Sequence, residues 1–220
     1  MKKENLSDWI KAIRSGINLH MRNQRVRFVE KKFGCDFGGH IRKKDLGYGQ
    51  GEGYDYTPSP DHIKVFCSKS NISSDDSIID IGCGKGYAMY LMGKYPFRKV
   101  GGVEKNSDLA AVAKKNMLGL DRDRYKVFEE DATNMASNPK LIDLVDEASY
   151  FYMYNPFPAN IVSRVIGILE NSAIRNARTI RIWYAAPDAD CYEVLLNNKS
   201  WRQTWQGRSH GQMIYIFESK

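Results

Sequence analysis

The chain has 220 residues, of which 42% are hydrophobic and 27% are charged, and its formal net charge is +7. This composition fits one folded domain with an extension and excludes wholesale disorder. No stretch approaches the roughly 18 uninterrupted apolar residues of a membrane span, and no apolar segment follows the first basic residues, so we expect neither a membrane anchor nor a secretory signal.

The first 60 residues form a basic extension. They carry 12 Lys and Arg against 7 Asp and Glu, a net charge of +5. Apolar residues at helical spacing predict a helix over residues 7–28 that packs an apolar stripe on the body; they are Leu6, Trp9, Ile10, Ile13 and Ile17. Residues 34–60 are rich in glycine and proline, which predicts a lid or a linker. The excess charge is either a solubilising surface or a site for an acidic partner such as a nucleic acid, an anionic lipid or an acidic protein.

From residue 61 onward, predicted strands and helices alternate. Strands are expected over residues 77–81, 99–104, 125–129, 149–154 and 179–184. Helices are expected over residues 61–67, 87–94, 107–118, 159–172 and 190–196. The chain closes with an antiparallel hairpin over residues 201–218. We therefore predict an α/β fold for residues 61–220, with a mainly parallel, Rossmann-like sheet, helices on both faces and the hairpin at one edge.

The strongest motif joins the first of these strands to the helix after it. The segment Ile79-Asp80-Ile81-Gly82-Cys83-Gly84-Lys85-Gly86-Tyr87 runs from an apolar strand through a glycine turn into a helix. Glycines at such a turn let the backbone approach a ligand at the carboxyl end of the sheet. Two cofactor classes bind at turns of this kind, namely dinucleotides and S-adenosylmethionine.

Three details favour S-adenosylmethionine. The glycine spacing is GxGxG, not the GxGxxG of dinucleotide sites. Asp80 lies two residues before the first glycine, where a carboxylate would repel a pyrophosphate but attract a sulfonium or an ammonium. Asp131 follows the third strand and can accept a hydrogen bond from an adenine amine. Glu104, at the end of the second strand, suits a ribose diol in either cofactor class.

Residues 54–218 resemble the class I, Rossmann-type S-adenosylmethionine-dependent methyltransferases. The resemblance rests on Asp80–Gly86, Val103-Glu104, Glu130-Asp131-Ala132 and the closing hairpin. It implies that Asp80 and the backbone of the glycine loop hold the methionine part of the cofactor, that Glu104 holds the ribose and that Asp131 holds the adenine. With their neighbours, the expected cofactor-binding residues of these motifs are Asp80, Gly82, Cys83, Gly84, Gly86, Glu104, Lys105, Asp131 and Ala132.

The segment Tyr154-Asn155-Pro156-Phe157-Pro158 follows the fourth strand. It resembles the Asn/Asp-Pro-Pro-aromatic motif of amino-group methyltransferases, but Phe157 stands where a second proline is usual. Similar Asn-Pro-Phe segments occur in protein-lysine methyltransferases of this fold. We therefore expect Tyr154, Asn155, Pro156 and Phe157 to hold the methyl acceptor. The alternative is a rigid turn that ends a buried strand.

Another segment, Tyr54-Asp55-Tyr56-Thr57-Pro58-Ser59-Pro60, precedes the first helix of the core. It resembles a segment that closes over the cofactor in small lysine-type methyltransferases, and we count Tyr56 and Thr57 among the cofactor-binding residues. The hydroxyls of Thr57 and Ser59 are expected to bind the methionine carboxylate at the start of the helix at Asp61, or simply to cap that helix.

These observations predict a cytoplasmic S-adenosylmethionine-dependent methyltransferase that acts on an amine, with protein lysine as the favoured acceptor. The open alternatives are a small molecule, a lipid or RNA as acceptor, a non-catalytic adenosine-cofactor binder and, more remotely, a dinucleotide oxidoreductase. The four cysteines contain no CxxC and the four histidines have no ligand spacing. We therefore expect no metal site, and we expect a reducing compartment.

Overall fold

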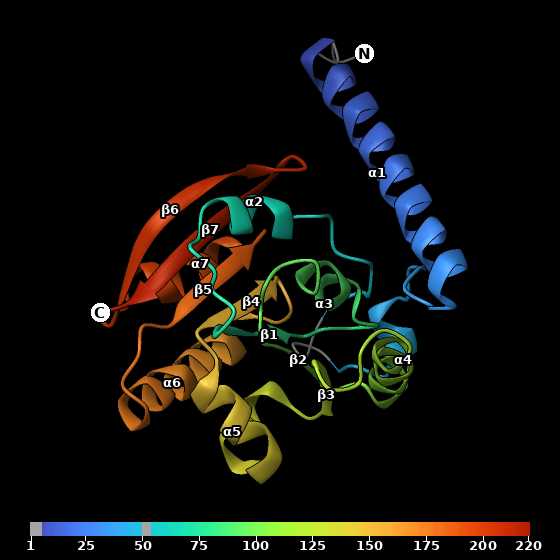
Figure 1. The fold of residues 1–220 in the computed structure, drawn as a ribbon. Coiled ribbons are helices and arrows are strands. Elements are labelled where there is room, and N and C mark those ends of the chain that lie inside the picture. The colour runs from blue at the N-terminus through green and yellow to red at the C-terminus, as the bar shows by residue number, and fades with distance from the viewer. Residues whose placement is uncertain (1–5, 50–53) are drawn as a thin grey trace.

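A computed structural model describes the backbone of residues 6–49 and 54–220, with side chains from His20 onward. Its centre is a seven-stranded sheet in the order β3-β2-β1-β4-β5-β7-β6 (Figure 1). The strands are β1 (Ser77–Ile81), β2 (Lys99–Glu104), β3 (Tyr125–Glu129), β4 (Tyr150–Tyr154), β5 (Arg181–Ala185), β6 (Trp201–Ser209) and β7 (Gln212–Ser219). Strands β1 to β5 are parallel, and β7 pairs antiparallel with both β5 and β6. The predicted fold class is therefore confirmed.

Helices pack on both faces of this sheet. They are α1 (Leu6–Phe33), α2 (Ile63–Ser68), α3 (Tyr87–Met92), α4 (Ser107–Leu118), α5 (Pro139–Glu147), α6 (Ala159–Arg175) and α7 (Ala189–Leu196), with two short 3-10 helices, η1 (Lys43–Leu46) and η2 (Ala132–Ser137). Helices α5, α6 and α7 share one apolar core, and α2, α3, α4 and the end of α1 share the other. Alternate residues of β4 enter the two cores, Tyr150 and Tyr152 on one side and Phe151 and Met153 on the other. This is the period of two that a strand dictates.

Most predicted elements coincide with the structure. The strands over 77–81, 99–104 and 125–129 and the helix over 107–118 match β1, β2, β3 and α4, and within the core the other predicted ends differ by three residues or fewer. Both 3-10 helices and α5 were not predicted. Helix α5 carries a start signal, because Asn138 accepts hydrogen bonds from the amides of Lys140 and Leu141 and Pro139 occupies the first turn.

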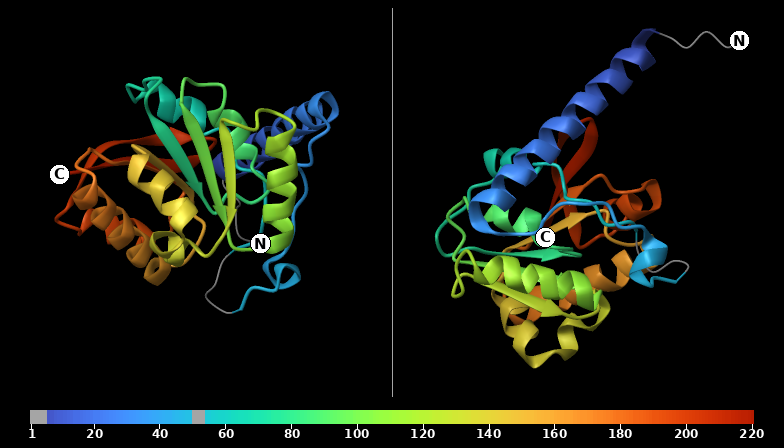
Figure 2. Two further views of the ribbon diagram at one scale, coloured as in Figure 1. Left: turned by 60° about the horizontal axis from the view of Figure 1, so that its bottom comes forward. Right: turned by 90° about the vertical axis from the view of Figure 1, so that its right-hand side faces the viewer.

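Helix α1 continues to Phe33, five residues past its predicted end. It ends where Gly34 adopts a left-handed φ of 67°, and the Glu30 carboxylate accepts hydrogen bonds from the amides of Phe37 and Gly38 at 2.8 and 2.6 Å. Val26 and Val29 are buried against the body, whereas the first part of the helix leads away from it (Figures 1 and 2). The expected apolar stripe, Leu6 to Ile17, lies where only the backbone is described.

The segment after α1 is held to the core by the buried amide of Asn116 and by the ammonium of Lys85. Asn116 of α4 is 3% exposed. Its Nδ2 donates to the carbonyls of Asp36 and Lys85 at 2.8 and 2.9 Å, and its Oδ1 accepts from the Asp36 amide at 2.9 Å. The ammonium of Lys85 returns to Asp36 Oδ1 at 2.8 Å and to the Gly38 carbonyl at 3.0 Å. Residues 36–38 are thereby fixed beside the glycine loop.

Replacement of Asn116 tests this anchor. Asn116→Ala leaves three backbone groups of Asp36 and Lys85 without their partner, and we expect the free energy of unfolding to fall by about 2–4 kcal/mol. Denaturant unfolding measures the loss. The neighbouring exposed Lys115→Ala is the control, with no change expected beyond about 0.5 kcal/mol. A loss of no more than about 0.5 kcal/mol for Asn116→Ala would show that the anchor contributes little.

Candidate active site

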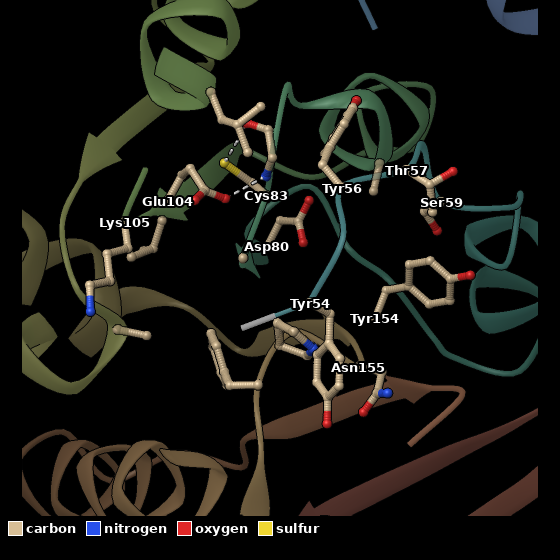
Figure 3. Close-up of a pocket in the computed structure, with 18 of the residues that line it drawn as sticks. Tyr54, Tyr56, Thr57, Ser59, Asp80, Cys83, Glu104, Lys105, Tyr154 and Asn155 are labelled. Carbon is tan, nitrogen blue, oxygen red and sulfur yellow. Dashed lines mark hydrogen bonds between the residues drawn. The ribbon is translucent and has the colours of Figure 1, made fainter. Parts of the chain in front are cut away.

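A cavity of about 730 Å³ opens at the carboxyl ends of β1, β2 and β4 (Figure 3). Its size lies within the range of small-molecule sites. Every predicted site residue except Gly86 lines it, namely Tyr56, Thr57, Asp80, Gly82, Cys83, Gly84, Glu104, Lys105, Asp131, Ala132, Tyr154, Asn155, Pro156 and Phe157. The fold therefore brings the predicted cofactor residues and the predicted acceptor residues into one space.

The glycine loop lies so close to Pro156 and Tyr56 that Gly82 and Gly84 leave no room for a side chain. Gly82 and Gly84 have φ values of 80° and 53°, which favour glycine. A Cβ on Gly82 would lie 2.6 Å from Pro156 Cβ, and one on Gly84 would lie 2.4 Å from the Tyr56 ring. Gly86 instead caps α3 with a φ of 86°, so its role in the structure is to turn the chain into that helix.

Asp80 is a buried carboxyl group of the cavity. It is 2% exposed, and no residue in the described part of the chain donates a hydrogen bond to it. Burial, with the nearby charge of Glu104, raises the pKa of Asp80 well above its usual value. Figure 3 shows the carboxyl group near the middle of the lining residues. An ammonium or sulfonium in the cavity would supply the missing partner, so the site fits the cationic end of S-adenosylmethionine.

Glu104 already holds three hydrogen bonds within the chain. Its Oε2 accepts from the Gly84 amide at 2.8 Å, and its Oε1 accepts from the Tyr48 hydroxyl and the Asn106 amide, both at 2.9 Å. A carboxylate has about four lone-pair sites. A ribose diol that used both oxygens would therefore have to take the place of the Tyr48 hydroxyl. The sequence did not reveal Tyr48, which comes from the glycine-rich segment before the core.

Asp131 caps η2 and pairs with a neighbouring lysine. Its Oδ1 accepts from the amide and the hydroxyl of Thr133 at 2.9 and 2.7 Å, and Lys105 Nζ lies 3.3 Å from Oδ2. Burial alone would raise the pKa of Asp131, but the Thr133 hydrogen bonds and the Lys105 charge hold it below its usual value. The carboxylate is therefore ionised at neutral pH and suited to accept a hydrogen bond from an amine.

The acceptor segment ends β4 in an unusual backbone conformation. Asn155 has a φ of 38°, a region that asparagine tolerates better than most residues. Its Oδ1 accepts from the Asp188 amide at 3.4 Å, and Asp188 Oδ2 accepts from the Tyr54 hydroxyl at 2.7 Å. Tyr54, Tyr154 and Phe157 line the same cavity as Asn155. Asp188 joins the Tyr54 hydroxyl to the Asn155 amide through these two hydrogen bonds.

The Thr57 and Ser59 hydroxyls do not cap helix α2, so the capping alternative is wrong, while their binding of the methionine carboxylate stays a prediction. Helix α2 begins at Ile63, four residues after Ser59 and two after the predicted start, and Asp61 Oδ1, not a hydroxyl of Thr57 or Ser59, accepts from the amide of Lys64 in its first turn at 3.2 Å. Ser59 Oγ instead bonds the Pro60 carbonyl at 2.9 Å and the Tyr152 hydroxyl at 2.8 Å. Thr57 Oγ1 accepts from Arg22 at 3.4 Å. Both hydroxyls join the segment to the body.

Several lining residues were not predicted. Among them are Lys43, Leu46, Tyr48, Arg164 and Gln212. Most of these five come from η1 and the segment beside it. The glycine content of that segment predicts a lid or a linker but indicates no individual site residue. Gln212 reaches the cavity because β7 inserts between β5 and β6, and that order follows from long-range pairing. In the described part of the chain, no cluster of three His, Cys, Asp or Glu could hold a metal ion, and no helix there is long and apolar enough to cross a membrane.

A family model described as ribosomal RNA adenine dimethylase matches residues 48–183. No curated protein matches the chain.

Among solved structures, the chain resembles a ribosomal protein L11 methylase from Lactobacillus delbrueckii subsp. bulgaricus (11% identity, 71% of this chain and 76% of that one, TM-score 0.54). It also resembles an RNA methyltransferase from Salinibacter ruber crystallised with S-adenosyl-L-homocysteine (15% identity, 74% and 94%, TM-score 0.53). A third similar structure is a precorrin-6y C5,15-methyltransferase from Geobacter metallireducens (15% identity, 74% and 89%, TM-score 0.52). At these identities the likeness shows the fold.

The substitution Asp80→Asn should change ligand affinity and protein stability in opposite directions. The variant loses a charge-assisted contact, and we expect the affinity for S-adenosylhomocysteine to fall roughly 10- to 100-fold. Without ligand, the Asp80→Asn variant should be more stable than the wild type at pH 8. The raised pKa means that the folded wild type keeps a proton that the unfolded chain releases above about pH 3.9. Wild-type stability therefore falls as pH rises from there towards the raised pKa, and the variant lacks this loss.

Calorimetry and thermal unfolding at pH 5 and pH 8 measure the two effects of Asp80→Asn. Asp75→Asn, at an exposed position just before β1, is the control for the loss of one carboxylate. Unchanged affinity of Asp80→Asn at pH 8 would remove Asp80 from the ligand site.

Proposed function

Because the chain belongs to the ribosomal RNA adenine dimethylase family, whose members are S-adenosylmethionine-dependent methyltransferases, we propose that it methylates the exocyclic amine of an adenine in RNA. One observation carries the proposal. The family match spans residues 48–183, and this range contains the glycine loop, Glu104, Asp131 and the Asn155–Phe157 segment, which all line the same cavity.

An adenine replaces protein lysine as the favoured acceptor. A lysine side chain has a pKa of about 10.4 and must lose a proton before it can attack. Beside Asn155 stands Tyr54, whose own pKa is raised by burial and by its hydrogen bond to Asp188, so this hydroxyl is a poor base. An adenine amine is neutral at pH 7 and needs no base before attack. Aromatic walls also suit a base that is stacked out of its strand.

The residues of the chain act mainly by alignment. The bound cofactor supplies a methyl group on a positively charged sulfur. Asn155 Oδ1 would accept a hydrogen from the target amine and so turn its lone pair towards that methyl group. Phe157 and Tyr54 would hold the ring plane. Placement of this kind can lower a barrier by several kcal/mol without a proton donor.

The basic extension offers a surface for the RNA backbone. The described part of α1 exposes four basic side chains, Arg25, Arg27, Lys31 and Lys32. Lys43 and Arg164 stand at the cavity itself. We propose that α1 contacts phosphates, which position an RNA without reading its sequence.

The direct test uses S-adenosylmethionine with a labelled methyl group, protein-free RNA and, in parallel, protein acceptors rich in lysine. We expect label in the RNA, sensitive to ribonuclease and recovered after digestion as N6-methylated adenosine. Label in protein alone would contradict the proposal and restore lysine as the acceptor. Label in another nucleobase would contradict the assignment to adenine.

Two substitutions of Asn155 separate its side chain from its backbone. Asn155→Gly removes the amide and tolerates the positive φ, whereas Asn155→Ala removes the amide and adds about 1 kcal/mol of strain. We expect both variants to lower kcat roughly 10- to 100-fold, with S-adenosylhomocysteine affinity within about twofold of wild type, and Asn155→Ala alone to lose stability. Turnover retained in Asn155→Gly would show that the segment is only a turn.

Salt dependence of RNA binding tests the role of α1. Each phosphate contact to a single strand contributes a slope of about −0.7 in log K against log salt. Alanine at the four α1 positions should therefore reduce the slope by up to about 3. The matched control replaces four exposed bases elsewhere on the molecule, Arg122, Lys126, Lys140 and Lys199. Equal slopes for wild type and the α1 variant would exclude the helix from the RNA interface.

A further inference from the structure

A second concave surface, the α1–α3 groove, lies between the last turns of α1 and helix α3. Its volume is about 380 Å³. The lining residues that matter here are Met21, Arg25 and Phe28 of α1, with Tyr87 and Tyr90 of α3 and Lys94 just after it. Tyr87 also lines the cavity of the active site, so the groove adjoins that cavity.

The α1 side of the groove presents apolar side chains that the fold leaves open. Phe28 is 68% exposed and Met21 is 48% exposed. With Arg25 they recur at intervals of three and four residues, which places side chains on one face of a helix. Burial of Val26 and Val29 fixes this part of α1 on the body, so the Phe28 ring is held beside the groove. Exposed apolar side chains that gather at a concave surface mark an interaction site.

The α3 side of the groove is aromatic. The centre of the Tyr90 ring lies 6.1 Å from that of Tyr87, with the two planes 23° apart, and 6.0 Å from that of Phe33 at the end of α1. Lys94 Nζ lies 4.6 Å from the centre of the Tyr90 ring. The groove therefore combines flat apolar surfaces with positive charge.

The charge in the groove is of one sign. None of the described residues that line it is acidic. Burial lowers the pKa of Lys94; the charge of Asp61 opposes this shift and that of Arg25 adds to it. Arg25 and Lys94, one from each side, are thus near enough to repel each other, and an anion at the groove would relieve this repulsion. Aromatic rings for stacking with cations for phosphates are the combination that binds single-stranded nucleic acid.

We propose that the α1–α3 groove binds an unpaired nucleotide of the RNA substrate outside the target adenosine, with its base stacked on Phe28 and its phosphate at Arg25 and Lys94. This inference rests on the proposed function. The shared residue Tyr87 lets one strand occupy both spaces, with the target base in the cavity and a flanking base in the groove. The family match begins at residue 48, so the α1 side of the groove lies outside the part of the chain that it covers.

The test measures affinity by fluorescence anisotropy for single-stranded RNA oligomers that share one adenosine and differ in the position of one abasic nucleotide. An abasic nucleotide keeps its phosphate and lacks its base, so the charge of the oligomer is unchanged. For wild type, we expect one position outside the adenosine at which the missing base weakens binding roughly 5- to 100-fold, the worth of one stacked base. Phe28→Leu keeps an apolar side chain without a ring. It should bind the intact oligomer more weakly by the same factor and should not respond to the missing base at that position.

Three comparisons separate stacking from other effects. Phe28→Trp keeps a ring and should respond to the abasic nucleotide as wild type does. Ile174→Ala removes an exposed apolar side chain from α6 and should also behave as wild type. Phe28→Leu removes no charge, so the salt dependence of its RNA binding should equal that of wild type, unlike that of the variant with four alanines in α1. The response to a missing base compares oligomers on one preparation, so it does not depend on how much of a variant is folded.

Other occupants of the groove would give different results. Wild-type affinity of Phe28→Leu for every oligomer would overturn the inference and leave the groove to a protein partner. A wild-type dimer in sedimentation that Phe28→Leu dissociates would assign the groove to a second copy of this chain and overturn the inference as well. The proposed function stands in both cases if wild type methylates adenosine in RNA. If wild type methylates no RNA, the proposed function is overturned, and this inference with it.

Discussion

The site depends on the buried carboxyl group of Asp80, which receives no hydrogen bond from any residue in the described part of the chain. Burying such a group is costly unless a partner arrives, and Asp80 is buried at the end of a central strand. The glycine loop beside it runs so close to Tyr56 and Pro156 that no side chain fits. Folding therefore maintains a polar space that a cationic ligand completes. This is the physical basis for a cofactor site in a fold that carries many functions.

The N-terminal segment is part of this site. Asn116 and Lys85 fix residues 36–38 beside the glycine loop, and an antiparallel bridge joins Ile41 to Tyr56. Tyr48 and Tyr54 then reach Glu104 and Asp188 by hydrogen bonds. The cavity thus takes walls from both sides of the predicted boundary at residue 60. Helix α1 precedes these residues and exposes four basic side chains, those of Arg25, Arg27, Lys31 and Lys32.

The features that the sequence predicts are those that depend on residues close to one another in the chain. The strand, turn and helix around Gly82 to Gly86 form one continuous segment, residues 77–92, and the parallel sheet brings Asp80, Glu104 and Asp131 to one edge. Asn116 acts on a residue 80 positions away, and His62 meets Gln212 across 150 positions. No spacing rule links such pairs, because their contact depends on the strand order of the finished sheet. Helix α5 is different, because its start signal at Asn138 and Pro139 is local in the sequence.

A crystal structure of the chain with S-adenosylhomocysteine would show whether this cavity binds an adenosyl amino acid with its charged end at Asp80. We expect the ligand amine beside Asp80, the ribose at Glu104 with the Tyr48 hydroxyl displaced, and the adenine at Asp131. A ligand bound outside the cavity, or bound within it with its amine away from Asp80, would refute this assignment.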